Sequence, residues 1–228
     1  MSQNSSKPHF AIAIDGPAAS GKSTLARELA RRLGLVMVNS GAMYRAVTWM
    51  ALRENIDPSD AAAVVAMLSQ IRIECGESGM SSTFTIGGID PGDELRSEVI
   101  NANVSAISAI PEVREKLVNL QRSYLDRTSI VMEGRDIGSV VFPDTPFKIY
   151  VDADEEVRAA RRSLAGEVDS VSKRDAADSE RVTAPLVVAN GATILDTSHH
   201  SIESAVDAAI EILAKQGLES PQPSPTSK

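Results

Sequence analysis

The sequence predicts an α/β fold in which a five-stranded parallel sheet lies between two layers of helices. The chain has 228 residues, of which 43% are hydrophobic and only 4% aromatic, so its core must be built from Ala, Val, Ile and Leu. Such aliphatic cores are typical of buried parallel strands covered by helices. Short apolar segments also alternate with amphipathic ones along most of the chain. The length suits one compact domain with an insertion.

The first strand, helix and strand follow one another without a gap. Residues 10–15 read FAIAID, the segment LARELARRLG has helical periodicity up to Gly34, and residues 35–40 read LVMVNS. Glycine directly after the last periodic residue is a common helix end. This order of elements predicts a βαβ unit.

Three further strands are predicted at 128–133, 147–153 and 192–197, which gives the doubly wound sheet its five members. Residues 71–92 differ, because their pattern and turn residues favour a short antiparallel meander. They lie between helical stretches at about 43–70 and 94–126, so we interpret them as an insertion. Residues 1–8 and 216–228 are polar or rich in Ser and Pro, and we predict that both are disordered tails.

Composition excludes several classes of protein. One cysteine, Cys75, rules out a disulfide scaffold, and only His9, His199 and His200 could join it in a zinc cluster. No apolar run approaches the ~18 residues of a membrane span, and the amino terminus lacks an apolar signal region, so we expect a cytoplasmic protein with no membrane partner. The net charge of −8 argues against nucleic acid as a partner.

A phosphate-binding loop is predicted directly after the first strand. Its sequence satisfies the pattern GxxxxGK[ST], and the next residue opens a helix. Backbone N–H groups of such a loop surround a phosphate, Lys22 reaches the β and γ phosphates of ATP, and Ser23 can bind Mg²⁺. A plain glycine-rich turn is the alternative. The predicted ATP-binding residues are Gly16, Pro17, Ala18, Ala19, Ser20, Gly21, Lys22, Ser23 and Thr24.

Charged residues follow the other predicted strands. Residues 39–45 (NSGAMYR) follow the second strand and residues 133–138 (EGRDIG) follow the third. The carboxyl ends of parallel strands meet at one edge of a sheet, so both segments should lie near the phosphate loop. Arginines also gather after the fourth strand. They can be a solvated helix face, but in an acidic chain their simplest partner is a polyphosphate. A regulatory GTPase is disfavoured because no Asp is followed three residues later by Gly.

Together these segments resemble the bacterial cytidylate (CMP) kinases, a family of nucleoside monophosphate kinases. The resemblance rests on the phosphate loop, NSGAMYR, ELRSEV, VSAISAIPEVR, EGRDIGSVVFPD and DSERVTAPL, and covers most of residues 10–213. It implies a P-loop kinase domain at 9–215, with a monophosphate-binding insertion at about 43–126 and a short lid at about 155–181. It also implies an enzyme that transfers the γ-phosphoryl of ATP to CMP or dCMP, with Mg²⁺ as cofactor.

The resemblance also implies roles for single residues. Around the cytosine it places Ser40, Ser105, Arg114 and Asp136. Near the acceptor phosphate it places Arg45, Arg96, Arg135 and Arg181. At the ribose it places Arg174 and Asp178, and on the transferring group the lid cations Arg161 and Arg162. The catalytic set is Lys22, Arg135, Arg161, Arg162 and Arg181. Ala18 and Ala19 stand where relatives often carry glycine.

Such a reaction needs no general base, because a phosphate monoester has a second pKa near 6 and is already a nucleophilic anion at neutral pH. The obstacle is repulsion between two polyanions, which Lys22, Mg²⁺ and the arginines offset. We expect small nucleotides as partners, and a monomer. Two alternatives remain open: a monophosphate kinase of other pyrimidine specificity, and a non-catalytic nucleotide-sensing module.

Overall fold

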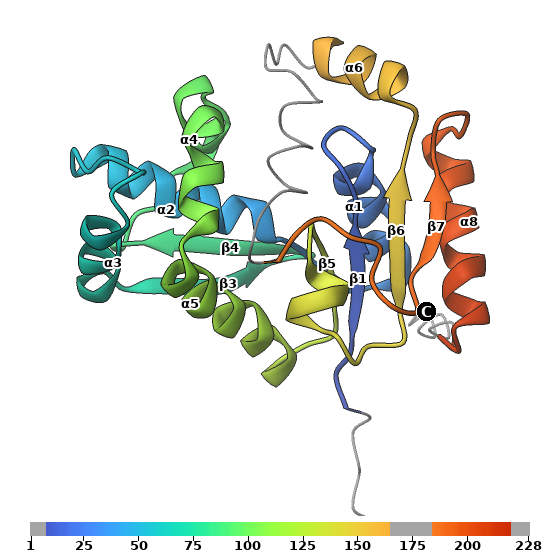
Figure 1. Cartoon of the computed structure of the whole chain (residues 1–228). Helices are drawn as coiled ribbons and strands as arrows, with labels where there is room; N and C mark the ends of the chain where they lie inside the picture. Colours follow the sequence, from blue (N-terminus) through green and yellow to red (C-terminus); the bar gives the residue numbers. More distant parts are fainter. Residues whose placement is uncertain (1–7, 165–183, 220–228) are drawn as a thin grey trace, which may run out of the picture.

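The structure is a computed structural model that describes residues 8–164 and 184–219. Most of the two predicted tails, and the predicted lid beyond residue 164, lie outside the described residues. Within them the chain forms one mixed sheet between helices (Figure 1). The strands run in the order β3-β4-β2-β5-β1-β6-β7, and this order places the first strand among its parallel neighbours.

All five predicted parallel strands are present and pair in parallel. Alternate residues of β1 face opposite sides, so Ile12 and Ile14 enter one hydrophobic cluster while Ala11 and Ala13 enter another. The α/β fold class is thereby confirmed. The five strands are β1 (Ala11–Asp15), β2 (Val36–Asn39), β5 (Ile130–Gly134), β6 (Lys148–Asp152) and β7 (Thr193–Asp196).

The prediction of five strands was wrong, because the sheet has seven. Strands β3 (Ile73–Ser78) and β4 (Ser81–Ile86) form an antiparallel hairpin in the segment predicted as a separate meander. The hairpin joins the sheet because Ser81 of β4 pairs with Met37 of β2, and the Met37 N–H donates to Met80 O at 2.9 Å. Pairing with β4 satisfies groups that an edge strand would otherwise expose.

Helices cover both faces of the sheet (Figure 1). One face packs against α1 and α8, and the other against α5 and the π-helical turn η3. The helical elements are α1 (Lys22–Leu33), α2 (Ser40–Arg53), α3 (Ala61–Gln70), η1 (Gly92–Arg96), α4 (Glu98–Ala109), α5 (Pro111–Arg122), η2 (Ser123–Asp126), η3 (Ile137–Val141), α6 (Glu155–Leu164) and α8 (Ile202–Lys215). Within the described ranges, no helix is both long and apolar enough to span a bilayer.

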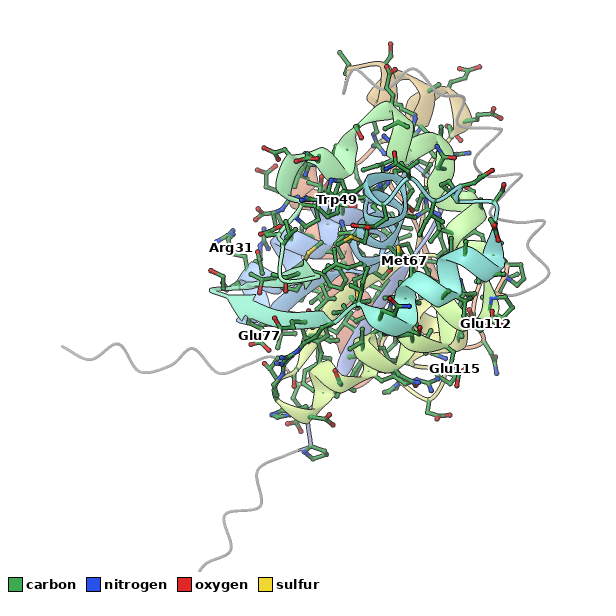
Figure 2. The ribbon with its side chains drawn as sticks, turned by 90° about the vertical axis from the view of Figure 1, so that its left-hand side faces the viewer. Arg31, Trp49, Met67, Glu77, Glu112 and Glu115 are labelled. Atoms are coloured by element: carbon green, nitrogen blue, oxygen red, sulfur yellow. The ribbon has the colours of Figure 1, made fainter. Side chains whose placement is uncertain are left out.

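Helices α2 to α5 and the hairpin share a third hydrophobic cluster. Trp49 and Met67 lie inside it, whereas Arg31 and Glu112 point outward at the periphery (Figure 2). The indole Nε1–H of Trp49 donates to Glu94 Oε2 at 2.7 Å, and this bond ties α2 to η1. The predicted insertion therefore has a core of its own beside the parallel sheet.

The residue that follows α8 forms hydrogen bonds with β6. Gln216, predicted as the first residue of a tail, receives a hydrogen bond from Lys148 N at 3.1 Å and donates one to Lys148 O at 2.9 Å. These bonds tie the end of α8 to the start of β6.

Candidate active site

A pocket of about 780 Å³ lies at the carboxyl edge of the parallel strands. Its walls come from the phosphate loop and α1 on one side, and from α2, η1 and α4 on the other. The start of the EGRD segment, the last turn of α6 and the β7–α8 connection complete it. Ligands collect at this edge of open α/β sheets. One pocket thus combines the phosphate loop with the predicted acceptor site.

The phosphate loop adopts a shape that only small residues allow. A Cβ on Gly16 would lie 2.0 Å from Val151 O, and Gly21 has a positive φ of 89°. No side-chain hydrogen bond caps the start of α1. Such a helix start, together with the helix dipole, favours a bound phosphate.

Contacts from two other elements hold the loop. Arg158 of α6 donates to Ala18 O at 3.3 Å, and the hydroxyl of Thr197 donates to Ser20 O at 2.8 Å. Ala19 has a φ of 59°, in the left-handed region that favours glycine. Ala19 therefore sits in a strained conformation.

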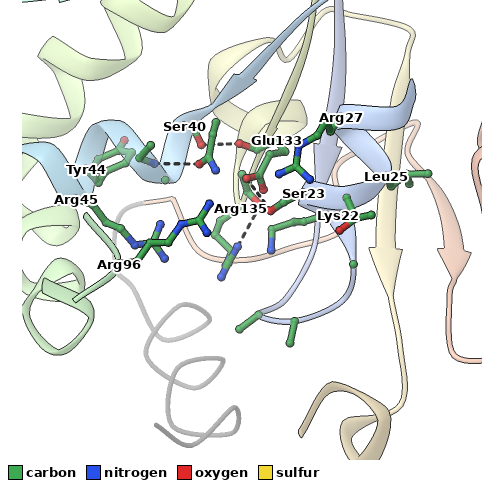
Figure 3. Close-up of a pocket in the computed structure, with 18 of the residues that line it drawn as sticks. Lys22, Ser23, Leu25, Arg27, Ser40, Tyr44, Arg45, Arg96, Glu133 and Arg135 are labelled. Atoms are coloured by element: carbon green, nitrogen blue, oxygen red, sulfur yellow. Dashed lines mark hydrogen bonds between the residues drawn. The ribbon is translucent and has the colours of Figure 1, made fainter. Parts of the chain in front are cut away.

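Lys22 and Ser23 lie where the phosphate loop passes into α1. Lys22 is buried, and its Nζ donates to Pro17 O at 2.9 Å across the loop. The Ser23 hydroxyl donates to Glu133 Oε1 at 2.9 Å, so the start of α1 is joined to the end of β5 (Figure 3). A hydroxyl beside a buried carboxylate is a set of hard oxygen donors, which suits Mg²⁺.

Arginines line the opposite side of the pocket. Figure 3 shows Arg45, Arg96 and Arg135 gathered between α2 and the phosphate loop, with Lys22 beside them. They come from three elements far apart in the sequence, namely α2, η1 and the segment after β5. Arg45 Nε donates to Asn101 Oδ1 at 3.4 Å, which links α2 to α4.

A buried ion pair lies deeper in the same wall. Arg114 of α5 pairs with Asp136 through its guanidinium, and both side chains are almost completely buried. Arg114 also donates to Ser108 O at 3.3 Å and stacks over the Tyr44 ring at 5.7 Å. A buried pair needs such supporting contacts to offset the cost of desolvation.

Ser40 is placed against the same segment. Its hydroxyl donates to Glu133 O at 2.8 Å. A Cβ on Gly134 would lie only 2.5 Å from that hydroxyl and 2.7 Å from Ile137, so only glycine fits there. The glycine of EGRD is therefore required by the packing of α2 against β5.

Arg161 and Arg162, the two arginines of α6 expected to act as lid cations, lie in the described part of the chain. Arg161 donates to Thr197 Oγ1 at 3.1 Å and to Thr197 O at 2.8 Å, and Arg162 is buried. Thr197 therefore accepts hydrogen bonds from Arg161 and donates one to the phosphate loop. Both arginines line the pocket.

The structure brings together nearly all the described residues that the sequence singled out. Gly16, Pro17 and Ser20 shape the loop but do not line the pocket. Arg174, Asp178 and Arg181 lie outside the described residues. Asn39, Tyr44 and Glu133 also line the pocket; they were not named as site residues, although they belong to the NSGAMYR and EGRDIG segments expected near the phosphate loop. Further lining residues were missed: Arg27, Asn101, Ser108, Thr197 and His200. Of these, Thr197 and His200 come from a connection without a motif.

Comparison with known proteins identifies the family of the chain. A family model described as cytidylate kinase matches residues 12–215. A cytidylate kinase of Mycobacterium leprae (strain Br4923) is 44% identical, over 90% of this chain and 95% of that protein. One of Streptomyces avermitilis is 38% identical, over 92% and 94%.

Among solved structures, a gluconokinase from Sinorhizobium meliloti 1021 superposes with a TM-score of 0.47 at 13% identity, over 91% of this chain and 93% of that chain. The family model and the curated relatives each span most of the sequence. The chain belongs to the cytidylate kinase family.

Proposed function

We propose that the protein transfers the γ-phosphoryl group of ATP to CMP or dCMP, giving ADP and CDP or dCDP. The observation that carries this proposal is that one and the same pocket places the phosphate loop opposite three arginines and a buried Arg114–Asp136 pair. A donor and an acceptor nucleotide fit such a pocket together.

The donor binds through the phosphate loop. The uncapped start of α1 receives a phosphate, and Lys22 exchanges its bond to Pro17 O for phosphate oxygens. Arg161 and Arg162 lie on the same side and neutralise charge on the group in transit. These residues stabilise the loose transition state of phosphoryl transfer more than they stabilise bound ATP.

The acceptor side supplies the cations that offset repulsion. Two unit charges about 4 Å apart repel by ~4 kcal/mol at an effective dielectric constant near 20, so two polyanions approach only with help. Arg45, Arg96 and Arg135 hold the acceptor phosphate in line with the donor. Its oxygen is the nucleophile, and no side chain has to remove a proton from it.

Asp136 selects the base. Cytosine presents an amino donor at position 4, which a carboxylate accepts, whereas uracil presents a carbonyl there. Arg114 fixes the orientation of Asp136 and keeps the buried charge paired. Uracil would place an acceptor opposite an acceptor, at a cost of about 1–3 kcal/mol.

Magnesium fits the Ser23–Glu133 pair. Ser23 is the residue that would contact the ion, and Glu133 would orient Ser23 and the bound water. When bound, Mg²⁺ neutralises the β and γ phosphates and helps to position them.

We further propose that the protein acts as a monomer in the cytoplasm. Its single cysteine, which is half-buried, is in keeping with a reducing compartment.

A coupled ADP-release assay with CMP, dCMP, UMP, AMP and GMP tests the proposal. We expect CMP and dCMP to be the best acceptors. ADP release that does not depend on any acceptor, or ATP binding without transfer, contradicts it. A preference for UMP would select the alternative pyrimidine specificity.

Two lysine variants show whether the pocket carries the activity. Lys22→Met should lower kcat by at least a hundredfold, because it removes the charge on the β and γ phosphates. Lys116→Met is the matched control, since Lys116 donates to Leu68 O and Ile71 O away from the pocket. It should keep kcat within about threefold, a difference of under ~1 kcal/mol in the barrier.

A further inference from the structure

Asp15 is a buried carboxylate at the end of β1 that the mechanism does not use. It is 4% exposed and directly precedes the phosphate loop, yet it does not line the pocket. Its two oxygens accept hydrogen bonds from the backbone N–H groups of Ile137, at 2.8 Å, and Gly138, at 2.7 Å. These are the two residues that follow Asp136, and they begin the turn η3.

Arg122 holds the other end of the same turn. From the end of α5, its Nε donates to Val141 O and its Nη2 to Val140 O, both at 2.8 Å. The turn thus has an anion at its first N–H groups and a cation at its last carbonyls. This is the arrangement of charge that a helical dipole favours.

The packing around the turn leaves it little freedom. A Cβ on Gly138 would lie 3.2 Å from Lys148 Cδ and 3.3 Å from Asp15 Oδ2, so the backbone passes tightly between these side chains. Lys148 is itself fixed, because its Nζ donates to Pro143 O and Asn190 O. A backbone held from both ends determines where the preceding side chain lies.

We propose that Asp15 and Arg122 are positioning residues for base recognition: by holding the turn η3 at both ends, they fix Asp136 where it meets the cytosine base. This inference rests on the proposed function, because it assigns Asp136 the role of reading the acceptor base. Neither residue touches the substrate. Asp15 joins the strand that carries the donor loop to the segment that carries the acceptor-binding residues.

Burial makes the charge on Asp15 costly for stability. Burial raises the pKa of Asp15 to about 6, against the lowering effect of its two backbone hydrogen bonds. The negative charge of Asp136 raises the pKa of Asp15 further, while the positive charge of Arg135 lowers it. An uncharged residue would avoid this cost, so the carboxylate is explained by its ability to accept two N–H groups at once.

The variant Asp15→Asn tests the proposal in the full-length protein. An amide keeps the shape but turns an N–H donor toward one of the two backbone N–H groups. We expect KM for CMP to rise at least tenfold and the CMP-to-UMP ratio of kcat/KM to fall at least fivefold. KM for ATP should stay within threefold. Arg122→Gln should change the same two quantities in the same direction, by a smaller factor.

Matched controls separate positioning from loss of stability. Gln216→Ala removes hydrogen bonds that hold β6, and Arg127→Gln removes a surface arginine that donates to Cys75 O. Both should leave the CMP-to-UMP ratio and the two KM values unchanged, even where the melting temperature falls.

Each outcome decides the proposal. Equal changes in KM for ATP and CMP, or an unchanged CMP-to-UMP ratio in both variants, overturn the positioning role and leave the proposed function intact. If Asp15→Asn yields no folded protein, the shift in KM and base ratio in Arg122→Gln decides instead. Wild-type protein that does not phosphorylate CMP refutes the proposed function and this inference with it.

Discussion

At the scale of single residues, the site depends on charges that are buried and paired. Arg114 and Asp136 are both nearly inaccessible, and each is the other's ion-pair partner. Removing one member of such a pair leaves an uncompensated charge, which costs more than the interaction itself contributes. Substitutions that keep shape and polarity are therefore more informative than truncation to alanine.

Asp136→Asn should relax the choice of base. An amide can accept from the amino group of cytosine, and it can also donate to the carbonyl of uracil. The ratio of kcat/KM for CMP to that for UMP should fall about tenfold, which corresponds to about 1.4 kcal/mol. Steady-state assays with both acceptors measure this, with KM for ATP as the internal control. A ratio that stays constant would mean that another residue reads the base.

Asp15 should give the protein a pH-dependent stability. Burial raises its pKa in the folded state from 3.8 to about 6. Between pH 4 and pH 6 the folded state therefore binds more protons than the unfolded state, and the free energy of unfolding falls as pH rises. The loss amounts to about 3 kcal/mol by pH 7. The variant Asp15→Asn lacks this titration.

Urea denaturation of both proteins at several pH values measures the effect. The difference in unfolding free energy, wild type minus Asp15→Asn, should decrease from pH 4 to pH 7. A difference that is constant, or that increases, contradicts a raised pKa. Taking the difference between the two proteins removes the contribution of titrating groups that they share.

At the scale of elements, connections without a sequence motif hold the phosphate loop. Thr197, at the end of β7, is buried and donates to Ser20 O while it accepts from Arg161 of α6. Arg158 of α6 reaches Ala18 O as well. The loop is therefore braced by two elements whose positions depend on the completed sheet.

Thr197→Val should weaken ATP binding. Valine has nearly the same shape but leaves the carbonyl of Ser20 without its hydroxyl partner, at a cost of about 1–3 kcal/mol. We expect a lower free energy of unfolding and a severalfold higher KM for ATP, with KM for CMP little changed. Thr48→Val is the control, because the Thr48 hydroxyl donates to Tyr44 O within α2. It should lower stability without raising KM for ATP.

At the scale of the whole molecule, the distribution of charge separates the pocket from the rest of the chain. The protein has a net charge of −8, yet Lys22, Arg45, Arg96, Arg135 and Arg161 all line one pocket. A concentration of positive charge attracts polyanions, and dissolved salt shortens the distance over which this attraction acts. Binding of both nucleotides should therefore depend on ionic strength.

Raising potassium chloride from about 0.1 M to about 1 M shortens the screening length from ~10 Å to ~3 Å. KM for CMP should rise severalfold, since the arginines proposed to hold its phosphate remain partly open to solvent. Initial rates across the salt series, with sucrose as an uncharged control, measure this dependence. A KM that does not change with salt contradicts electrostatic capture of the acceptor.

The sequence by itself determined the five parallel strands, the phosphate loop and the NSGAMYR and EGRDIG segments that lie beside it. Each of these is a local pattern: the period of apolar residues, the spacing of glycines, or a charged segment at the end of a strand. The fold class and the co-location of donor and acceptor segments follow, because parallel strands bring their carboxyl ends to one edge.

Only the tertiary structure decided the features that depend on contacts between segments far apart in the sequence. The hairpin joins the sheet through one pair between Met37 and Ser81, and no local pattern reports which edge a hairpin will meet. Thr197 reaches Ser20, and Asp15 reaches Ile137, across more than a hundred residues of sequence. Such contacts arise because a buried polar group must find a partner wherever the packed chain supplies one.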